Sequence, residues 1–387
     1  MRKKILFLIE SLGGGGAEKV LDTLVRHIDR DSFDVTLCPV VDTGCYAESL
    51  RGQCGYHPLI AAPHGALGRF WYKLKYHLIY HWLPLWFVYR LFVPKGNDVE
   101  VAFCEGFATR LLAHSSNKTA RKLAWLHTDL HNFHYTRRFF KNDDEEAWCY
   151  SRYDHIVAVS QTARDAFHVE FPSVTTPVTT IYNPIDIDAI RRAAAEQVEL
   201  PPKPQGVMRL VTTGRLVQVK GYDRLLRVAK RLLDEGHKIE LWILGEGDQR
   251  AALERQIADS GLGSCVRLWG FQRNPYVYLA ASDIFVCSSR AEGYSTAATE
   301  AIIVGLPVVT TECSGMNELL EDGKCGIIVA NDDDASAEGG LQASITRLLT
   351  DNILLDQYRC AATNRGEAFS LDATLQQVES LIDITTN

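Results

Sequence analysis

Short apolar runs alternate with segments of helical spacing along the whole chain. In the first half the strand-like runs are Lys4–Glu10, Asp34–Val40, Val99–Glu105, Lys122–His127 and His155–Ser160. In the second half they are Arg209–Thr213, Ile239–Leu244, Val266–Leu268, Ile284–Ser288, Pro307–Thr311 and Gly326–Val329. The helical segments between them include Tyr222–Asp234 and Gln249–Ala258. This alternation is typical of parallel strands joined by helices, so the chain is predicted to have an α/β fold.

The chain is long enough for two such sheets, because its 387 residues exceed the roughly 100–200 residues of one domain. A Pro- and Ala-rich segment, 191–206, interrupts the alternation and is predicted to connect the domains. We expect two Rossmann-like, doubly wound domains facing one cleft: residues 1–185 with about 370–387, and residues 186–369. The last helical stretch, 371–383, is predicted to pack back on the first domain. Ligands of such sheets bind beyond the carboxyl ends of the strands.

Charge and cysteine usage exclude several classes of protein. The chain has 41 basic and 48 acidic residues and a formal net charge of −7, which argues against nucleic acid as a partner. Its 10 cysteines are scattered singly and are predicted to be reduced, mostly core thiols. The basic start, residues 1–4, precedes only five apolar residues, too few for a signal peptide. We therefore expect a buried first strand and a cytoplasmic protein.

Residues 49–97 contain no Asp or Glu but many basic and aromatic side chains. Tyrosines at 72, 76 and 80 recur every four residues, which predicts a helix with distinct sides, and Pro84 ends or kinks it. The segment is too charged to span a bilayer. It is expected either to pack on its own domain or to lie in an anionic membrane surface; the absence of acid favours the membrane. The residues predicted to form this membrane face are Arg69, Trp71, Lys73, Lys75, Trp82, Trp86 and Arg90.

A glycine-rich turn, 13–16, follows the first predicted strand and opens a helical pattern. Glycines there let backbone N–H groups approach a ligand at the positive end of a helix. The spacing does not match GxGxxG, because the residue five after Gly13 is Glu18, so a nicotinamide-dependent oxidoreductase is disfavoured. A tight turn without a ligand remains the alternative.

Two loops of the second half resemble anion sites. Gly214, Arg215 and Lys220 lie between a predicted strand and a helix, where two fixed cations beside helix amides suit a diphosphate. Gly245 and Gly247 follow the next strand and permit close approach of the backbone. Solvated surface cations would produce the same pattern.

Two carboxylates flank a third loop. Glu292 precedes the turn 293–296, and Glu300 lies about one turn inside the helix that the turn opens. Side chains so arranged can bind different hydroxyls of one ligand while the helix N-terminus binds its phosphate. Alternatively, these are acids near the positive end of a helix.

These residues resemble the retaining GT-B glycosyltransferases of family 4. The resemblance covers essentially the whole chain. It rests on the order and spacing of four features: Glu292-x7-Glu300, Gly214-Arg215 with Lys220-Gly221, Gly245-x-Gly247, and Gly305-Leu306-Pro307-Val308-Val309.

The resemblance implies a role for each matching residue. Arg215 and Lys220 would neutralise the donor diphosphate, Glu300 would bind the ribose, and Glu292 would hold hydroxyls of the transferred sugar. His127 is similar to a first-domain histidine beside the donor sugar; alone, it would more often be a structural histidine. The catalytic group would be Glu292, His127, Arg215 and Lys220. Further donor contacts would come from Gly14, Gly15, Gly16, Gly214, Gly245, Gly247, Gly293, Tyr294, Ser295 and Thr296, with the base near Gly270 and Phe271. The hinge would be 183–186.

The implied reaction transfers a hexose or N-acetylhexosamine from a nucleotide sugar, UDP being favoured, with retention of configuration. The acceptor would be a membrane-associated glycan or lipid-linked sugar in polysaccharide, lipopolysaccharide or glycolipid assembly at the inner face of the cytoplasmic membrane. Fixed cations would stabilise the leaving diphosphate, so no metal or other cofactor is expected. The acidic stretches 186–188 and 332–334 are assigned to a hinge and a surface loop. A nucleotide-sugar epimerase and a catalytically silent membrane-associated protein are the alternatives.

Overall fold

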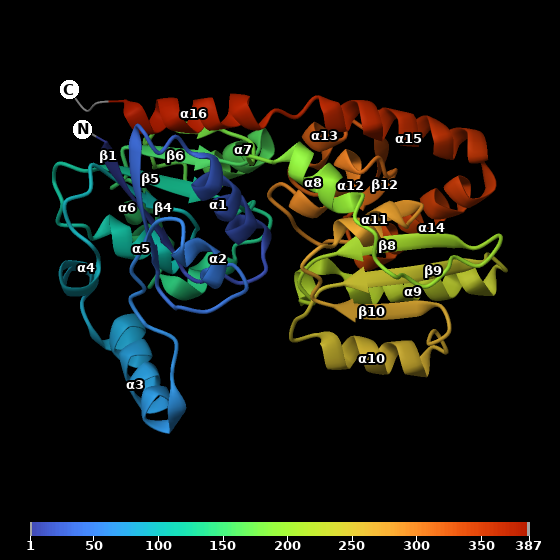
Figure 1. Cartoon of the computed structure of the whole chain (residues 1–387), viewed down its shortest axis with the longest axis horizontal. Helices are drawn as coiled ribbons and strands as arrows, with labels where there is room; N and C mark the ends of the chain where they lie inside the picture. Colours follow the sequence, from blue (N-terminus) through green and yellow to red (C-terminus); the bar gives the residue numbers. More distant parts are fainter. Residues whose placement is uncertain (1, 385–387) are drawn as a thin grey trace. The chain divides into compact units, whose positions relative to one another are not determined.

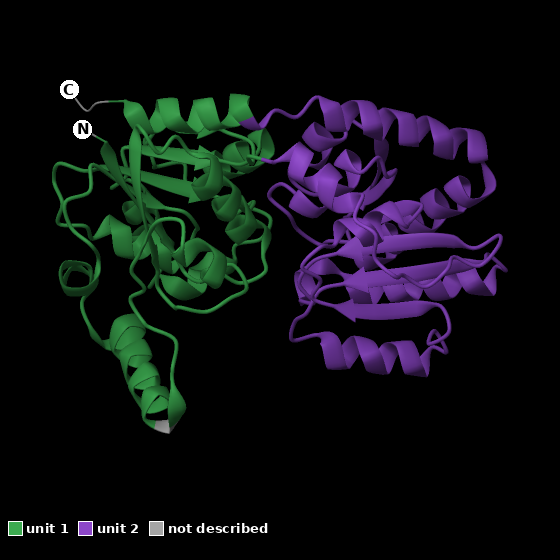
Figure 2. Cartoon of the chain, in the orientation of Figure 1, with its two compact units in different colours: residues 1–184, 372–387 green, residues 185–371 purple. Residues whose placement is uncertain are grey.

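The computed structural model describes residues 2–384, apart from the side chain of residue 66. Contacts divide the chain into two compact units (Figure 1, Figure 2). Unit 1 comprises residues 1–184 and 372–387, and unit 2 comprises residues 185–371. The chain therefore passes from one unit to the other twice.

Unit 1 contains a seven-stranded parallel sheet with the order β3-β2-β1-β4-β5-β6-β7. The strands are β1 (Lys3–Ile9), β2 (Phe33–Pro39), β3 (Gly55–Tyr56), β4 (Val99–Ala102), β5 (Arg121–Leu126), β6 (His155–Ala158) and β7 (Val178–Thr180). The helices are α1 (Gly16–His27), α2 (Ala47–Arg51), α3 (Gly65–His77), a π-helix (Leu78–Trp82), α4 (Leu85–Phe92), α5 (Phe107–Ala113), a 3-10 helix (Tyr135–Phe139), α6 (Asp143–Tyr150), α7 (Gln161–Glu170) and α16 (Leu371–Asp383).

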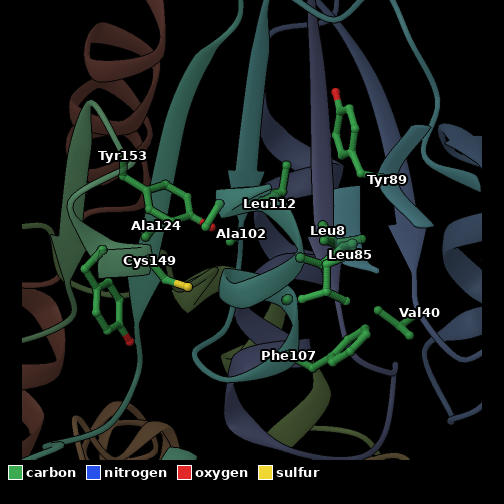
Figure 3. Packing of buried hydrophobic residues seen from close by; sticks show 14 of the residues in the cluster. Leu8, Val40, Leu85, Tyr89, Ala102, Phe107, Leu112, Ala124, Cys149 and Tyr153 are labelled. Atoms are coloured by element: carbon green, nitrogen blue, oxygen red, sulfur yellow. The ribbon is translucent and has the colours of Figure 1, made fainter. Parts of the chain in front are cut away.

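The core of unit 1 follows from the apolar runs. Residues 5–8 of β1 have no exposed surface, as expected for an inner strand of a parallel sheet that is covered on both faces. Figure 3 shows part of this core, in which Leu8 and Ala102 come from neighbouring strands and Phe107 opens α5. The two short strands β3 and β7 were not predicted, because two or three residues without an apolar run give no recognisable pattern.

The helix α16 packs on unit 1, which confirms the prediction for the end of the chain. Val378 and Ile382 are fully buried. Lys3 Nζ donates to the carbonyl oxygen of Ile382 over 3.2 Å, and Arg121 donates to that of Leu381. Apolar burial and capped carbonyls thus hold this helix beside β1 and β5.

Unit 2 contains a six-stranded parallel sheet with the order β10-β9-β8-β11-β12-β13. The strands are β8 (Met208–Thr213), β9 (Ile239–Leu244), β10 (Val266–Gly270), β11 (Ile284–Cys287), β12 (Val308–Thr311) and β13 (Gly326–Val329). The helices are α8 (Ile187–Ala194), a 3-10 helix (Gln218–Lys220), α9 (Tyr222–Asp234), α10 (Arg250–Asp259), α11 (Tyr276–Ala280), α12 (Thr296–Ile303), α13 (Met316–Leu319), α14 (Asp334–Thr350) and α15 (Asn352–Glu367). The predicted α/β fold with two parallel sheets is confirmed.

The interpretation of segment 191–206 as the connection between the domains was wrong. The chain changes units between Pro184 and Ile185, and the segment belongs to unit 2. Lys203 forms an ion pair with Asp283 at 2.8 Å, and Arg209 donates to the carbonyl oxygen of Pro201. These contacts fasten the Pro-rich segment to the second sheet.

Candidate active site

The loops after β8 and β9 meet backbone to backbone at the carboxyl edge of the sheet in unit 2. Gly245 has a φ of 138°, and a Cβ atom there would lie 1.9 Å from the carbonyl oxygen of Gly214. A Cβ atom on Gly247 would lie 2.3 Å from the carbonyl oxygen of Leu216. The N–H of Leu216 donates to the carbonyl oxygen of Glu246 over 2.8 Å. Both glycines are therefore required by the close approach of the loops.

Lys220 and Glu292 are brought together at the same edge. Lys220 Nζ donates to Glu292 Oε1 over 2.6 Å, and the hydroxyl of Ser289 donates to the same oxygen over 2.5 Å. Burial alone would lower the pKa of Lys220, but the Glu292 carboxylate raises it, so the ammonium form is secured. Arg215 is exposed at the exit of β8 and acts electrostatically on Lys220.

The turn before α12 directly follows Glu292 in the sequence. Ser295 caps the helix, since its side chain accepts a hydrogen bond from the N–H of Ala298 over 3.3 Å. The remaining N–H groups of the first turn give this end of the helix its positive potential. Glu300 is buried within α12, 5% exposed, and Tyr294 is buried in the turn.

A cationic network that sequence reasoning missed fixes the loop after β11. Arg224 is buried and donates to the carbonyl oxygens of Ser288 and Ser289 over 2.7 and 2.5 Å. Arg290 forms ion pairs at 2.8 Å with Asp223 of α9 and with Asp334 of α14. No sequence signal separated these arginines from ordinary surface cations.

The two acidic stretches have structural roles. Asp186 caps α8 by accepting from the N–H of Ala189 over 2.8 Å, and Asp333 caps α14 in the same way with Ser336 over 2.7 Å. Within residues 2–384, no group of three or more His, Cys, Asp or Glu side chains is arranged to hold a metal ion.

Of the predicted base-recognition residues, Gly270 is the last residue of β10 and Phe271 follows the strand. The carbonyl oxygen of Gly270 accepts from the N–H of Gly245 over 2.8 Å, which joins this loop to the loop after β9. The ring of Phe271 is 46% exposed.

In unit 1, His127 follows β5 directly. Its Nε2 is buried without a hydrogen-bond partner among the described residues, and its ring lies 5.0 Å from that of Phe103. Burial lowers the pKa of His127 to about 4, so the imidazole is neutral at physiological pH.

Sequence reasoning missed two carboxylates at this edge. Glu105 Oε1 accepts from the N–H groups of His127 and Thr128 over 2.5 and 2.6 Å, and burial raises the pKa of Glu105 to about 7. Glu10 accepts from the hydroxyl of Tyr80 over 3.1 Å, and burial raises its pKa as well. Each acid ends a strand-like run in the sequence. Because ligands of such sheets bind beyond the carboxyl ends of the strands, the sequence could have identified both acids as candidates.

The glycine-rich turn opens α1, with Gly15 as the residue before the helix. A Cβ atom on Gly15 would lie 2.3 Å from Glu18 Oε2, while Gly14 and Gly16 are exposed. The Glu18 carboxylate therefore lies against the positive end of α1.

The basic aromatic segment has a buried side and an exposed side. Tyr72, Tyr76 and Tyr80 pack against the core of unit 1, as expected for a segment that packs on its own domain. Seven of the fifteen large exposed apolar side chains of the described residues lie within 67–91. The seven are Leu67, Phe70, Trp71, Trp82, Trp86, Phe87 and Leu91. The predicted basic residues Arg69, Lys73, Lys75 and Arg90 are also exposed. None of the described helices is both long and apolar enough to cross a bilayer.

Known proteins resemble the chain in sequence and in fold. Residues 14–189 match the family "Glycosyltransferase Family 4", and residues 208–351 match "Glycosyl transferases group 1". An N-acetylgalactosamine-N,N'-diacetylbacillosaminyl-diphospho-undecaprenol 4-alpha-N-acetylgalactosaminyltransferase of Campylobacter jejuni is 28% identical over 95% of this chain and 96% of the relative. A poly(ribitol-phosphate) alpha-N-acetylglucosaminyltransferase of Staphylococcus aureus is 22% identical over 93% and 73%.

Solved structures agree on the fold. The superposition with Anabaena HepE in complex with UDP and glucose covers 99% of this chain and 100% of the HepE chain, with a TM-score of 0.74 and 20% identity. TarM of S. aureus covers 99% of both chains, with a TM-score of 0.72 and 14% identity. With two parallel-sheet units and both of these family matches, the chain belongs to the GT-B glycosyltransferases, its amino-terminal half to family 4 and its carboxyl-terminal half to group 1.

Proposed function

We propose that this glycosyltransferase moves a hexose or N-acetylhexosamine from a UDP-sugar, with retention of anomeric configuration, to a membrane-associated glycan or lipid-linked acceptor. The observation that carries the proposal is the Lys220–Glu292 pair beside the N-terminus of α12. The relatives named above support the acceptor class, since one acts on a diphospho-undecaprenol substrate and another on poly(ribitol-phosphate). Structural neighbours bound to UDP support the donor class.

The proposed chemistry follows the charge that develops on the leaving diphosphate. Lys220, Arg215 and the first N–H groups of α12 supply fixed positive potential for that charge. Glu292 holds hydroxyls of the transferred sugar, and Glu300 holds the ribose. His127, whose neutral Nε2 has no described protein partner, is assigned to the donor sugar. Retention is assigned to attack of the acceptor on the face that the diphosphate leaves.

The proposed location is the inner face of the cytoplasmic membrane. The exposed tryptophans of α3–α4 would lie at headgroup depth, and the lysines and arginines among them would contact anionic headgroups. A lipid-linked acceptor then reaches unit 1 from the surface that the protein itself contacts.

The first test is thermal stabilisation by UDP, GDP, ADP, CMP and NAD, each with and without EDTA. A ligand raises apparent stability by RT ln(1 + [L]/Kd). We expect a shift with UDP that EDTA does not change, because cations of the protein bind the diphosphate. A shift with NAD alone, or loss of the UDP shift in EDTA, would contradict the proposal.

A second test separates transfer from the two alternatives. Product analysis with a radiolabelled UDP-hexose and a lipid-linked sugar acceptor should find label in the acceptor. Label found only in an epimeric UDP-sugar would indicate an epimerase, and unaltered donor would indicate a silent binding protein.

A further inference from the structure

The segment between β5 and α6 contains a histidine held by two glutamates. The side chain of His134 is only 5% exposed. Its Nε2 lies 2.9 Å from Glu146 Oε2 of α6, and its Nδ1 lies 2.9 Å from Glu170 Oε1 at the end of α7. Both ring nitrogens therefore face carboxylate oxygens.

This geometry defines the charge of the ring. An ionised carboxylate only accepts hydrogen bonds, and a neutral imidazole has one N–H, so with both glutamates ionised the two contacts require an imidazolium. The other contacts of the glutamates are also with donors. Thr136 Oγ1 donates to Glu146 Oε1 over 2.7 Å, Arg137 donates to Glu170 Oε1 over 2.9 Å, and His131 Nδ1 lies 3.0 Å from Glu170 Oε2.

The titratable groups around His134 lie on both of the helices that it contacts. On α6, Asp143 adds negative charge near Glu146, whose pKa is raised by burial, and Tyr150 lies within electrostatic range of Glu146. On α7, burial works to raise the pKa of Glu170, but hydrogen bonds from His131 and His134 bring it below its usual range. The cations that share these glutamates, Arg137 and His131, are exposed by 57% and 49%.

The same segment reaches the edge of the sheet. Tyr135, next to His134, donates its hydroxyl to Glu105 Oε2 over 3.4 Å, and Glu105 in turn accepts from the N–H of His127. The ring of Phe139 lies 2.8 Å from the position of a Cβ atom on Gly106. A continuous set of contacts thus joins α6 and α7 to the backbone of His127.

We infer that His134 is a positioning residue: as an imidazolium bridging Glu146 and Glu170, it holds the segment 127–140 against the sheet and so fixes His127. Loss of either carboxylate contact removes one of the two bridges and releases the segment. The catalytic consequence rests on the proposed function, whereas the protonation state and the anchoring do not.

The protonation state is tested in the intact protein by NMR of ¹⁵N-labelled histidine. The His134 signals are identified by their loss in His134→Gln. We expect both ring nitrogens to be protonated at neutral pH in the wild type, with the carboxylates of Glu146 and Glu170 as their acceptors. A neutral His134 ring at pH 7 in the wild type would overturn the inference.

Anchoring is tested by hydrogen exchange of peptides that cover 127–140. Because buried hydrogen bonds to charged groups are strong, His134→Gln and Glu170→Gln should each raise exchange there by about tenfold or more. The matched control is His131→Gln, which contacts the same Glu170 from an exposed position and should leave exchange unchanged. Equal exchange in Glu170→Gln and the wild type would overturn the inference even if His134→Gln failed to fold.

The effect on catalysis is tested by measuring UDP release from UDP-hexose. The kcat should fall in Glu170→Gln, with the KM for UDP-hexose little changed, and should stay the same in His131→Gln. Altered exchange with an unchanged kcat would overturn the role of His134 in positioning His127. A wild type that turns over no UDP-sugar, with altered exchange in the variants, would defeat the proposed function and leave the anchoring in force.

Discussion

Lys220 ends the 3-10 helix that follows β8, and its Nζ donates to the Glu292 carboxylate. The pair keeps a cation in a fixed position before any substrate arrives, and preorganised charge of this kind contributes most where charge develops in a reaction. Glu300, buried one helical turn beyond the cap of α12, has no comparable role in binding the diphosphate.

We expect Lys220→Ala and Glu300→Ala to lower kcat/KM for the UDP-sugar by about 100-fold or more, because each removes a group that is proposed to contact the donor. Because Lys220→Ala also leaves the 11% exposed Glu292 without its cation, its turnover is compared with that of the wild type well below the melting temperature of the variant. The matched control is Lys230→Ala, whose lysine pairs with Asp234 on the surface of α9. Unchanged turnover in either test variant would contradict the site assignment.

Glu105 makes stability depend on pH. Burial raises the pKa of this carboxyl from 4.5 to about 7, so the folded protein binds a proton there that the unfolded chain has lost. The contribution of Glu105 to the free energy of unfolding is therefore fully present below pH 4.5 and is lost as the pH rises through 7. Glu105→Gln should abolish this part of the fall, up to about 3 kcal/mol between pH 4.5 and 8. Urea unfolding at pH 5 and pH 8 measures the difference; parallel pH profiles of the two proteins would refute it.

At the scale of elements, α3 and α4 present one side to the core and the other to solvent. The exposed side combines tryptophan, phenylalanine and basic side chains without any acid. Such a surface binds anionic membranes through apolar burial and charge together, and salt weakens only the second part.

The triple variant of Arg69, Lys73 and Lys75 to Glu should therefore no longer sediment with anionic lipid vesicles. The control changes three exposed arginines of unit 2, Arg255, Arg267 and Arg273, to Glu, which alters net charge by the same amount. Equal sedimentation of the test variant and the wild type would remove the membrane from the proposal.

Features with a local pattern in the sequence were predicted, and features that depend on distant residues were not. Buried parallel strands need continuous apolar runs, so every longer strand was predicted, whereas β3 and β7 are defined only by their neighbours in the sheet. The loop glycines were recognised by spacing. The anchoring of Glu105 was not, because its partners His127 and Tyr135 lie 22 and 30 residues away in the sequence. Segment 191–206 was misjudged because the contact of Lys203 with Asp283 is also non-local, with the two partners 80 residues apart in the sequence.

At the scale of the whole molecule, unit 1 is completed by a helix that follows unit 2 in the sequence. Four apolar side chains of α16 are buried: Leu375, Val378, Leu381 and Ile382. At roughly 1.5–3 kcal/mol for each buried side chain, their removal costs unit 1 several kcal/mol.

A chain that ends at residue 371 should therefore show a calorimetric transition at lower temperature than the full chain, while the UDP-dependent transition of unit 2 is unchanged. The control is Ile384→Ser, since Ile384 is 54% exposed beyond the helix. An unaltered thermogram of the shortened chain would show that α16 contributes little to unit 1.

This order of segments also affects synthesis. A ribosome produces residues 185–371 before α16, so unit 2 is available to fold while the sheet of unit 1 still lacks its last helix. The nascent amino-terminal half must wait, with part of its apolar surface uncovered, until α16 has been translated. Residues 1–184, which are made first, should thus determine how much the nascent chain depends on chaperones.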